Sequence, residues 1–483
     1  MKSAVVVGSG PNGLVAAVTL ARAGWRVTVH EASDTPGGGT RSAELTAPGA
    51  LSDVCSAVHP LAVASPVMRS LPLEEHGLAW VHPEAPLGHA LADGRAVMLE
   101  RSIQATADGL GPDAAAWKTL MGPLADSAGQ LVDTVLTRSP AALEFSPRSL
   151  AAAGRFALAA SRSASALAGR FEGERARALL AGLAGHSVLR LDRAPSGGVG
   201  LMLGLLAHVV GWPVARGGSQ AIADALVSVL HAEGGEVVTA HRVESLAELG
   251  DVDAVLLDTS VMEFARLAGH ALPAGYERSL GRVRQGPGVC KVDWLLDGQV
   301  PWADERLLRA GTVHLGGNLE QIAAAESGVW AGRHPERPYV LLAQQSLFDP
   351  TRLRSAAVSG AQVVWAYTHT PVGSTLDVSD SVAAVVEQAA PGFRDRILST
   401  RVMSATDMQR HNTNYPGGDI TGGIADLRGM LVRPTVVAPW RTPLAGLYLC
   451  SASTPPGAGV HGMCGWHAAR CVLVDHGSGR PRV

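Results

Sequence analysis

The sequence predicts an α/β protein in which a doubly wound parallel sheet is combined with an α+β domain. Three observations support this prediction: a strand, glycine turn and helix at the N terminus, a similar unit near the C terminus, and an alanine- and leucine-rich middle. A chain of 483 residues also exceeds the size at which one hydrophobic core is usual, so we expect two domains.

The composition is that of a globular protein with little disorder, since 47% of the residues are hydrophobic and 17% are charged. A formal net charge of -3 leaves no sequence-wide basic field, which argues against a nucleic-acid partner and favours small molecules. Five cysteines without a C-x-x-C pair indicate neither a disulfide framework nor a zinc ribbon, so we expect no metal.

The beginning of the chain and its apolar runs predict a cytoplasmic protein. The first strand starts within the first few residues, which leaves no room for a cleavable signal peptide. The longest apolar run, residues 199–214, is shorter than the roughly 18 to 20 residues that a membrane-spanning helix needs. We interpret this run as a buried helix or as a helix that lines a pocket.

The N-terminal unit carries a dinucleotide-binding pattern. An apolar run over residues 4–7 is followed by Gly8-Ser9-Gly10-Pro11-Asn12-Gly13 and by a helical stretch that continues to Ala23. In such a unit the first glycine permits a tight turn, the second lets the backbone approach a pyrophosphate, and the third lets the helix lie close to the strand. The helix N terminus then faces the phosphates.

Two further features follow this turn. Residues 26–30 form a second strand, and Glu31 and Ala32 come next, where a carboxylate accepts hydrogen bonds from ribose hydroxyls. Beyond them, Gly37-Gly38-Gly39-Thr40-Arg41-Ser42 forms another glycine turn with a cation placed to meet phosphate. The alternatives are an ordinary tight turn of an α/β protein and a surface arginine.

The C-terminal unit repeats the arrangement. Residues 447–450 form a strand, and the segment Ser451-Ala452-Ser453-Thr454-Pro455-Pro456-Gly457-Ala458-Gly459-Val460-His461-Gly462 follows before a final helix. Both ends of the chain therefore have a glycine-rich turn between a strand and a helix.

These segments resemble a known family. The acid followed by the Gly37–Ser42 turn resembles the glutathione-reductase-type flavoproteins, in the branch that contains amine oxidases and phytoene desaturases. The C-terminal turn is similar to the phytoene-desaturase-like segment Gly-Ala-Gly-Thr-His-Pro-Gly-Gly-Gly-Val, which binds the ribityl chain and flavin ring. By this resemblance FAD is the cofactor, and Ser451, Ala452, Gly457, Gly459 and Val460 bind it.

The sequence departs from the family pattern at three positions of this turn. Serines stand at 451 and 453, where the family usually has glycines, and Pro455 replaces its histidine. A serine hydroxyl can still donate a hydrogen bond to a phosphate or ribityl oxygen. The resemblance also assigns to the cofactor Val243, at the end of an expected strand over 236–243.

The resemblance covers nearly the whole chain and is greatest to the phytoene-dehydrogenase-like group that includes pyridine nucleotide-disulphide oxidoreductase domain 2-like proteins. It implies a glutathione-reductase-type FAD-binding Rossmann domain interleaved with an α+β substrate domain that has a mixed sheet and a helical cap. We expect the FAD-binding domain to comprise residues 1–75, 214–285 and 405–483. The substrate domain then comprises residues 76–213 and 286–404.

Several segments predict the substrate domain. Residues 87–212 have helical spacing and predict the cap. Residues 289–296 alternate like a half-buried strand, and 339–348 and 363–370 also predict strands. The last places Trp365, Tyr367 and His369 on one side, where they either line a substrate cavity or pack a sheet core.

The segment 145–171 is basic and contains no acidic residue between its two phenylalanines. It predicts an amphipathic helix with arginines near heptad spacing, at Arg148, Arg155, Arg162 and Arg170. Such a helix either rests on an anionic membrane surface and admits a lipid, or is a solvated face; we favour the solvated face.

The predicted function is that of an FAD-dependent oxidoreductase of dehydrogenase or desaturase type. It takes hydride from a C–H bond of a largely apolar small-molecule or lipid-like substrate to flavin N5. The chain has no second G-x-G-x-x-G after a strand, so oxygen, a quinone or another soluble acceptor receives the electrons.

A base within hydrogen-bond reach of the substrate would take the proton. The candidate bases are His461, then His59, and then His411 with Tyr415. A structural hydrogen bond is the alternative role for His461, and His59 is more typical of a structural residue.

Two other functions fit the same resemblance. One is a non-redox flavin-dependent isomerase, as some polyene isomerases of the wider family are. The other is a flavin-free lipid- or prenyl-binding protein like the Rab GDP-dissociation inhibitors. The intact glycine turns, with Glu31 and Arg41, argue against loss of the cofactor.

Overall fold

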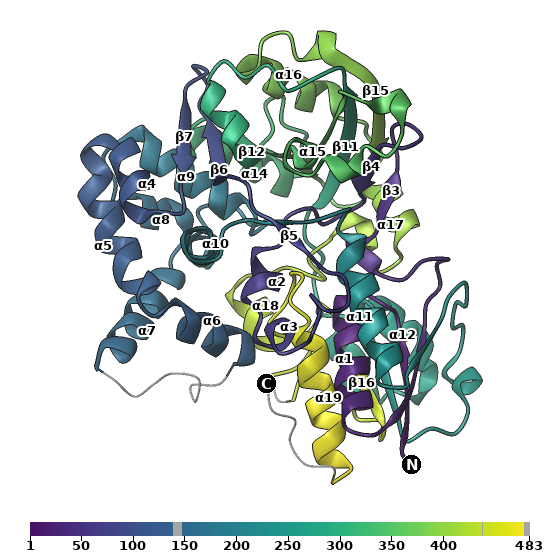
Figure 1. Ribbon diagram of the computed structural model, residues 1–483. Helices are drawn as coiled ribbons and strands as arrows, with labels where there is room; N and C mark the ends of the chain where they lie inside the picture. Colours follow the sequence, from purple (N-terminus) through teal and green to yellow (C-terminus); the bar gives the residue numbers. More distant parts are fainter. Residues whose placement is uncertain (139–146, 437, 478–483) are drawn as a thin grey trace.

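The computed structural model describes residues 1–138, 147–436 and 438–477. It contains two principal sheets, with a group of helices beside them (Figure 1). The N-terminal strand belongs to the smaller sheet, and segments from the middle and end of the chain return to it.

The smaller sheet is parallel and has the strand order β16-β10-β1-β2-β9. Its strands are β1 (Ser3–Val7), β2 (Arg26–His30), β9 (Glu236–Val238), β10 (Ala254–Leu257) and β16 (Leu447–Leu449). All five residues of β1 are buried, which explains its continuous apolar run, because a parallel sheet is covered on both faces.

Helices cover both faces of this sheet. One face packs against α1, α11 and α19, which lie side by side in Figure 1, and the other against α12 and α13. Their bounds are α1 (Pro11–Arg22), α11 (Gln220–Ala232), α12 (Val261–Ala268), α13 (Ala274–Leu280) and α19 (Met463–Asp475). The expected doubly wound α/β domain is therefore confirmed.

The larger sheet has seven strands in the order β15-β11-β14-β13-β12-β6-β7, and only β12 and β6 pair in parallel. The expected mixed sheet is thus confirmed. Its strands are β6 (Ala85–Ala90), β7 (Ala96–Leu99), β11 (Gly288–Leu296), β12 (Ala310–Leu315), β13 (Val340–Ala343), β14 (Gln362–Thr370) and β15 (Ile397–Met403).

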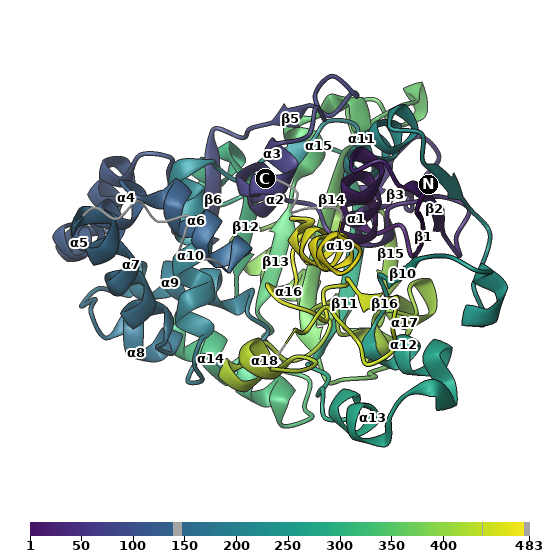
Figure 2. The same ribbon diagram turned by 90° about the horizontal axis from the view of Figure 1, so that it is seen from below.

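A helical layer packs against this sheet at the β6 and β7 end, as Figure 2 shows from below. Leu87 and Leu99 from the sheet, and Tyr339 directly before β13, share a core with Trp117 and Leu180 from the helices. The helices are α4 (Ile103–Gly109), α5 (Ala114–Ala125), α6 (Ala128–Thr137), α7 (Pro147–Ala160), α8 (Ala164–Ala168), α9 (Glu174–Gly185) and α10 (Ser196–Val209).

The remaining named strands and helices lie between these layers or pack against the larger sheet. The strands are β3 (Ser42–Glu44), β4 (Leu51–Asp53), β5 (Trp80–Val81) and β8 (Val214–Ala215). The helices are α2 (Pro60–Ala64), α3 (Pro66–Arg69), α14 (Leu319–Trp330), α15 (Gln345–Phe348), α16 (Ser379–Ala389), α17 (Ala405–His411) and α18 (Leu427–Val432). Within the described ranges, none of the helices has the length and apolarity to cross a membrane.

Three expected elements differ from the structure. The cap region begins with β6 and β7, because pairing with β12 overrides the weak local preference of its small residues. The strand expected over 339–348 ends at Ala343, where Gln344 turns and donates to the carbonyls of Leu307 and Ala310. The strand expected over 236–243 ends at Val238, because Ala240 has a left-handed φ of 52°.

The expectation that residues 289–296 form a half-buried strand is also wrong. All nine residues of β11 are buried, and its two faces join separate hydrophobic clusters. Lys291 and Asp293 tolerate burial because they form an ion pair with each other. The alternation in the sequence therefore separates two buried environments.

The basic segment 145–171 does not form one helix. Its described part contains α7 and α8, which are separated by a turn in which the Ser163 side chain caps α8. Arg155, Arg162 and Arg170 are exposed, whereas residues 145–146 and the side chain of Arg148 lie outside the described structure. The solvated face that we favour for this segment remains a prediction, and membrane contact remains its alternative.

The strands of the five-stranded sheet come from the three segments expected for the cofactor domain, and those of the seven-stranded sheet from the other two. The domain boundaries themselves remain a prediction. The two sheets matter for function because the ends of β1, β2 and β10 and one face of β14 border a common cavity.

Candidate functional site

A cavity of about 990 Å³ lies between the two sheets and the helical layer. This volume is at the upper end of the range, roughly 300 to 1,000 Å³, that is typical of ligand pockets. One end is lined by the glycine turns, and we call it the dinucleotide end. The other is lined by α6, α7, α10 and the β14 face, and we call it the substrate end.

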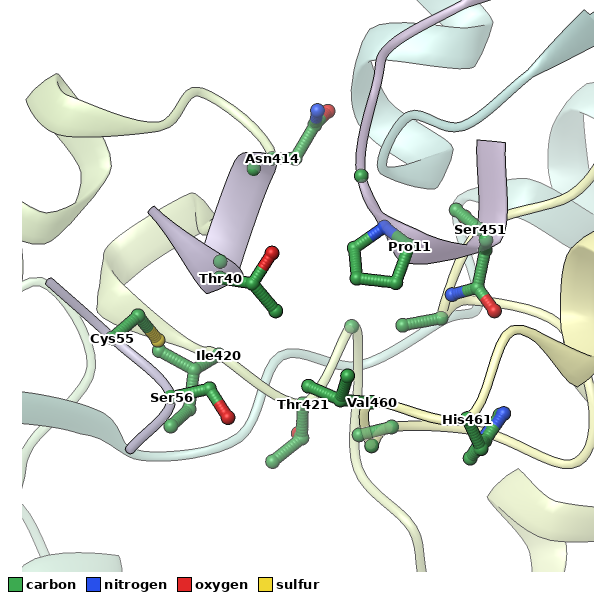
Figure 3. A pocket seen from close by; sticks show the side chains of 18 of the residues that line it. Pro11, Thr40, Cys55, Ser56, Asn414, Ile420, Thr421, Ser451, Val460 and His461 are labelled. Carbon is green, nitrogen blue, oxygen red and sulfur yellow. The ribbon is translucent and has the colours of Figure 1, made fainter. Parts of the chain in front are cut away.

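The first glycine turn forms part of the dinucleotide end. Gly8, Gly10, Pro11 and Asn12 line the cavity, and Pro11 faces the open space in Figure 3. Gly8 has a φ of +101°, and a Cβ on Gly10 would lie 2.6 Å from Asp258 Oδ2. Side chains at these positions would therefore strain the turn or displace the wall.

Gly13 has a different role from the other two glycines. It does not line the cavity, and a Cβ there would lie 2.2 Å from the carbonyl oxygen of Gly8. It therefore allows α1 to pack against the turn, which is the third role expected in this motif.

Glu31 lies at the end of β2, where Ala32 also lines the cavity. Its Oε2 accepts hydrogen bonds from Ser9 N (3.1 Å) and Ser9 Oγ (2.5 Å), and Oε1 accepts one from Ser33 N (2.9 Å). These bonds fix a carboxylate at the position expected to meet ribose hydroxyls.

The second glycine turn lies directly against the first. A Cβ on Gly38 would be 3.1 Å from Gly10 Cα, and Gly38, Gly39 and Arg41 all line the cavity. Gly37 and Ser42 do not line it: Gly37 N donates to the carbonyl oxygen of Ser9, and Ser42 Oγ donates to Asp53. They support the turn from behind.

Arg41 is held beside His411. Its Nε donates to the carbonyl oxygen of Gly38 at 3.1 Å, and its Nη2 lies 3.1 Å from His411 Nε2. Because arginine only donates, His411 accepts through Nε2 and carries its proton on Nδ1. Burial and the neighbouring Arg41 lower the pKa of His411 to about 4, so the ring is neutral and orients the cation.

The C-terminal turn completes the dinucleotide end. Ser451, Ala452, Gly459, Val460 and His461 line the cavity, whereas Gly457 does not. In Figure 3 Ser451, Val460 and His461 lie across the open space from Thr40 and Cys55. Val243, in the irregular segment beyond β9, also lines the cavity.

His461 is bonded through both ring nitrogens to its own turn. Its Nδ1 accepts from Met463 N at 3.0 Å, so Nε2 carries the proton and donates to the carbonyl oxygen of Gly457 at 3.2 Å. Burial lowers the pKa of His461 to about 4. This geometry matches the structural role that the sequence left open.

His59 differs from His461 in one respect. Ser219 Oγ donates to the carbonyl oxygen of Ser56 at 2.7 Å and therefore accepts from His59 Nε2 at 2.8 Å. His59 Nδ1 is therefore unprotonated and carries a lone pair, which has no hydrogen-bond partner among the described residues. Burial lowers the pKa of this cavity-lining histidine to about 4, although Asp53 opposes the shift.

Tyr415 lies against the second glycine turn. A Cβ on Gly39 would be 2.4 Å from its hydroxyl oxygen, so this glycine makes room for the phenol. Burial raises the pKa of Tyr415 well above its usual value. The phenol is therefore protonated at neutral pH and lines the cavity as a donor.

Asp258, which no sequence motif indicated, follows β10 and lines the cavity beside α1. Its Oδ2 accepts a hydrogen bond from Gly13 N at 2.9 Å. Burial, together with the nearby charge of Glu31, raises the pKa of Asp258 to about 7. The position of an acid directly after a buried strand could have indicated Asp258. The sequence did not show, however, that this strand, β10, pairs with β1 and β16.

A buried ion pair supports the wall behind His59. Asp53 Oδ2 lies 2.8 Å from Arg352 Nη1, and Asp53 Oδ1 accepts from Ser219 N at 2.7 Å. Burial alone would raise the pKa of Asp53, but Arg352 and the hydrogen bonds to the carboxylate lower it below its usual value. Asp53 therefore fixes Ser219, and Ser219 fixes His59.

The substrate end is almost entirely apolar. Trp365 and Tyr367 line its β14 side with their rings 5.3 Å apart and nearly perpendicular, whereas His369 bonds to buried Glu326 at 2.9 Å. The two aromatic residues thus both line the cavity and pack the sheet. Lining side chains on the helices are Val132, Val135, Leu136, Phe156, Val199, Met202 and Leu203.

Formal charge is confined to the dinucleotide end. The charged side chains among the described lining residues are Glu31, Arg41, Arg242, Asp258, Glu263 and Arg410. In the described part of the chain there is also no group of three potential metal ligands, and the five cysteines are free thiols.

Several buried polar atoms on the cavity wall lack partners within the described structure. They belong to Asn12, His59, Thr259 and Trp365. Because buried polar groups are normally hydrogen-bonded, these atoms fit a cavity that receives a polar ligand.

Comparison with known proteins identifies the family. Residues 12–270 match the flavin-containing amine oxidoreductases. The chain belongs to this family. It is 26% identical to the rat and mouse proteins called pyridine nucleotide-disulfide oxidoreductase domain-containing protein 2, over 98% of this chain and 93% of each relative.

Solved structures show the same fold. An oxidoreductase from Methanosarcina mazei has a TM-score of 0.65 at 17% identity, covering 98% of this chain and 100% of its own. Wild-type putrescine oxidase bound to putrescine has a TM-score of 0.60 at 17% identity, with 99% of both chains covered. Cyclohexylamine oxidase from Brevibacterium oxydans has a TM-score of 0.58 at 14% identity, again with 99% of both chains covered.

The cofactor of this oxidoreductase is FAD, and the dinucleotide end fits it. The glycine turns leave backbone space at the α1 N terminus, Glu31 offers acceptors for ribose, and Arg41 offers a cation for phosphate. The flavin-free alternative is therefore rejected.

Proposed function

We propose that this protein is an FAD-dependent dehydrogenase or oxidase that removes hydride from a C–H bond of an uncharged, largely apolar substrate. The observation that carries the proposal is the uncharged, apolar substrate end, which shares one cavity with the dinucleotide end. When bound, FAD supplies the hydride acceptor at its N5 atom.

The charge distribution supports an uncharged substrate over a cationic amine. A buried ammonium group needs a carboxylate or several acceptors to offset its lost hydration. The acidic groups of the described lining are Glu31, Asp258 and Glu263, and all three lie at the dinucleotide end. Putrescine oxidase and cyclohexylamine oxidase share the fold at low identity, so their names do not determine the substrate here.

The residues of this chain would hold the substrate and exclude water. Met202, Leu203 and Phe156 form an apolar wall opposite the sheet. His59 is the candidate base best supported by geometry, because its Nδ1 lone pair is unpartnered within the described residues, whereas both ring nitrogens of His461 are bonded. Tyr415 and His411 instead orient the second glycine turn and Arg41.

For the electrons we propose oxygen, a quinone or another soluble acceptor. The sequence contains one G-x-G-x-x-G motif directly after a strand, and that motif follows β1 in the sheet beside the FAD site. No further motif directly after a strand is left in the sequence to bind NAD(P)H. Stopped-flow reoxidation of the reduced holoenzyme by air-saturated buffer and by a soluble quinone separates these acceptors. Rapid reoxidation by NADP⁺ alone would contradict the proposal.

The substrate class is tested by anaerobic mixing of the holoenzyme with neutral apolar compounds and with primary amines of matched size. We expect bleaching of the visible flavin band by members of the neutral set. Bleaching by amines alone would overturn the proposal. Conversion of a neutral compound to an isomer without bleaching would instead support the flavin-dependent isomerase.

A further inference from the structure

A pair of histidines stands at the substrate end. His186 follows the last residue of α9 and lines the cavity, and its ring packs edge-on against Trp212 at a centroid distance of 5.3 Å. Its Nε2 lies 2.8 Å from Nε2 of His314, a fully buried residue of β12. One of these two nitrogens must donate and the other accept.

Both rings are neutral. Burial lowers the pKa of His186 to about 3, and burial together with His186 lowers that of His314 well below its usual value. Each ring therefore carries one N–H, and a single proton lies between the facing Nε2 atoms. The position of the second proton determines what His186 presents to the cavity.

The surroundings of His314 determine which ring donates. His314 Nδ1 is buried and has no partner in the described structure. An orphaned N–H is rarer in protein interiors than an acceptor that lacks a partner, so the proton of His314 is placed on Nε2. His314 therefore donates to His186 and keeps an unpaired lone pair at Nδ1.

His89 supports this assignment. Its Nε2 donates to the carbonyl oxygen of Gly317 at 2.8 Å, so its Nδ1 is a lone pair. A Cβ on Gly182 would meet His89 Nδ1 at 2.6 Å and His314 Nδ1 at 2.7 Å, so the two nitrogens approach the same glycine. Within the described chain they form no hydrogen bond, as expected for two lone pairs.

His186 thus accepts through Nε2 and carries its own proton on Nδ1. That N–H has no partner among the described residues, and its ring lines the largely apolar substrate end of the cavity. We propose that His186 donates a hydrogen bond to a neutral carbonyl oxygen of the substrate, so that the substrate class is an apolar ketone, aldehyde or ester. This inference rests on the proposed function.

A carbonyl fits better than a carboxylate or an amine. The described lining of the substrate end provides no cation to balance a carboxylate and no anion to balance an ammonium group. A carbonyl oxygen only accepts, which complements a group that only donates. His314 is then a positioning residue, because it fixes the tautomer of His186.

The test is binding to the holoenzyme, followed through the visible flavin spectrum and tryptophan fluorescence. The probes are octan-2-one and octane, which differ by one carbonyl group. A hydrogen bond with a net value of about 1 kcal/mol changes affinity roughly fivefold. We expect the ratio of octane Kd to octan-2-one Kd to fall about fivefold in His186→Phe, with the octane Kd unchanged.

His186→Gln is the matched variant, because its amide also has an N–H donor, and it should retain most of the ketone preference. Flavin content and thermal unfolding confirm that both variants are folded. If His186→Phe keeps the wild-type ratio, or if His186→Gln loses it as fully as His186→Phe, the inference is overturned. Flavin bleaching is not measured here, so this outcome is separate from that of the oxidation experiment.

Discussion

The two ends of the cavity are built in different ways. The dinucleotide end consists mainly of backbone and charged groups from short turns, such as Gly8–Gly13 and Gly37–Arg41. The substrate end consists of side chains from α6, α7, α10 and β14, which are far apart in the sequence. The difference teaches that cofactor binding depends on local backbone geometry, whereas substrate selection depends on tertiary packing.

The largest effect is expected at the first glycine turn. Gly8→Ala places a Cβ 2.8 Å from the carbonyl oxygen of Asp258 at a φ of +101°. We expect FAD to bind on the order of 100-fold more weakly, because backbone strain of about 3 kcal/mol at such a position corresponds to that change in Kd. The measurement is the flavin-to-protein ratio after purification.

Gly24→Ala is the control, because Gly24 also has a positive φ of +82° but no atom lies within 4 Å of its added Cβ. It should remain yellow. Full FAD occupancy in Gly8→Ala would break the proposed dependence of the dinucleotide end on backbone space.

A charged residue introduced at the substrate end should weaken ligand binding without affecting FAD binding. Val199→Asp places a carboxylate on the apolar wall formed by α10. A neutral ligand that binds there must desolvate this carboxylate, which costs about 2 kcal/mol or more of binding free energy and weakens binding roughly 30-fold. Flavin content should stay unchanged. Ligand Kd values from flavin spectral changes provide the measurement.

Val209→Asp is the matched control, because Val209 belongs to the same helix but is 37% exposed and outside the cavity lining. It should bind neutral ligands like the wild type. Equal weakening in both variants would mean that the charge acts through the helix and not through the cavity.

A smaller effect is expected from His461→Ala. The substitution removes two hydrogen bonds, to Gly457 O and from Met463 N, and loosens the C-terminal turn. At about 1 kcal/mol for each bond we expect FAD to bind roughly tenfold or more weakly. Titration of the apoprotein with FAD gives this value.

In the same series, His59→Ala should retain FAD affinity but slow flavin reduction by substrate. A variant of His461 that binds FAD normally and reduces slowly would reverse the roles assigned to the two histidines.

The smallest effect concerns pH and Asp258. The pKa of Asp258 is raised to about 7 in the folded protein, so folding favours the protonated acid. Its contribution to the free energy of unfolding is therefore complete below the unfolded pKa near 3.8 and is lost as the pH rises through 7. Asp258→Asn should therefore raise the melting temperature at pH 8.5 by a few degrees, on the order of 2 °C per kcal/mol, and change it little at pH 4.

The same acid lies beside the helix end where phosphate is expected. Wild-type apoprotein should bind FAD more weakly at pH 8.5 than at pH 6, and Asp258→Asn should reduce this difference. An unchanged pH dependence in the variant would assign the effect to a group other than Asp258.

The sequence predicted the cofactor end well because its information is local. A strand, a glycine turn and a helix occupy about twenty residues, and Glu31 and Arg41 follow at fixed distances along the same unit. In the structure these segments meet at one cavity end, and the C-terminal turn joins them because β16 pairs with β10. Tyr415 and His411, which the sequence suggested as candidate bases, also line the cavity beside the second glycine turn.

The sequence predicted less of the second domain. β6 and β7 lie in a stretch with helical composition, and both faces of β11 are buried despite its alternating pattern. Small residues such as alanine have weak preferences, so strand pairing determined their conformation. Charged residues usually indicate an exposed face, but Lys291 and Asp293 are buried as an ion pair, so the sequence pattern was misleading.

By itself, the sequence determined the cofactor class, the parallel sheet and the residues of the glycine turns, because strand–turn–helix units are specified by neighbouring residues. Only the tertiary structure placed Asp258 beside Gly13, Arg352 beside Asp53 and His314 beside His186. These partners are more than 100 positions apart, and such contacts arise from how the layers pack. The choice of substrate therefore depends on long-range packing that no local pattern encodes.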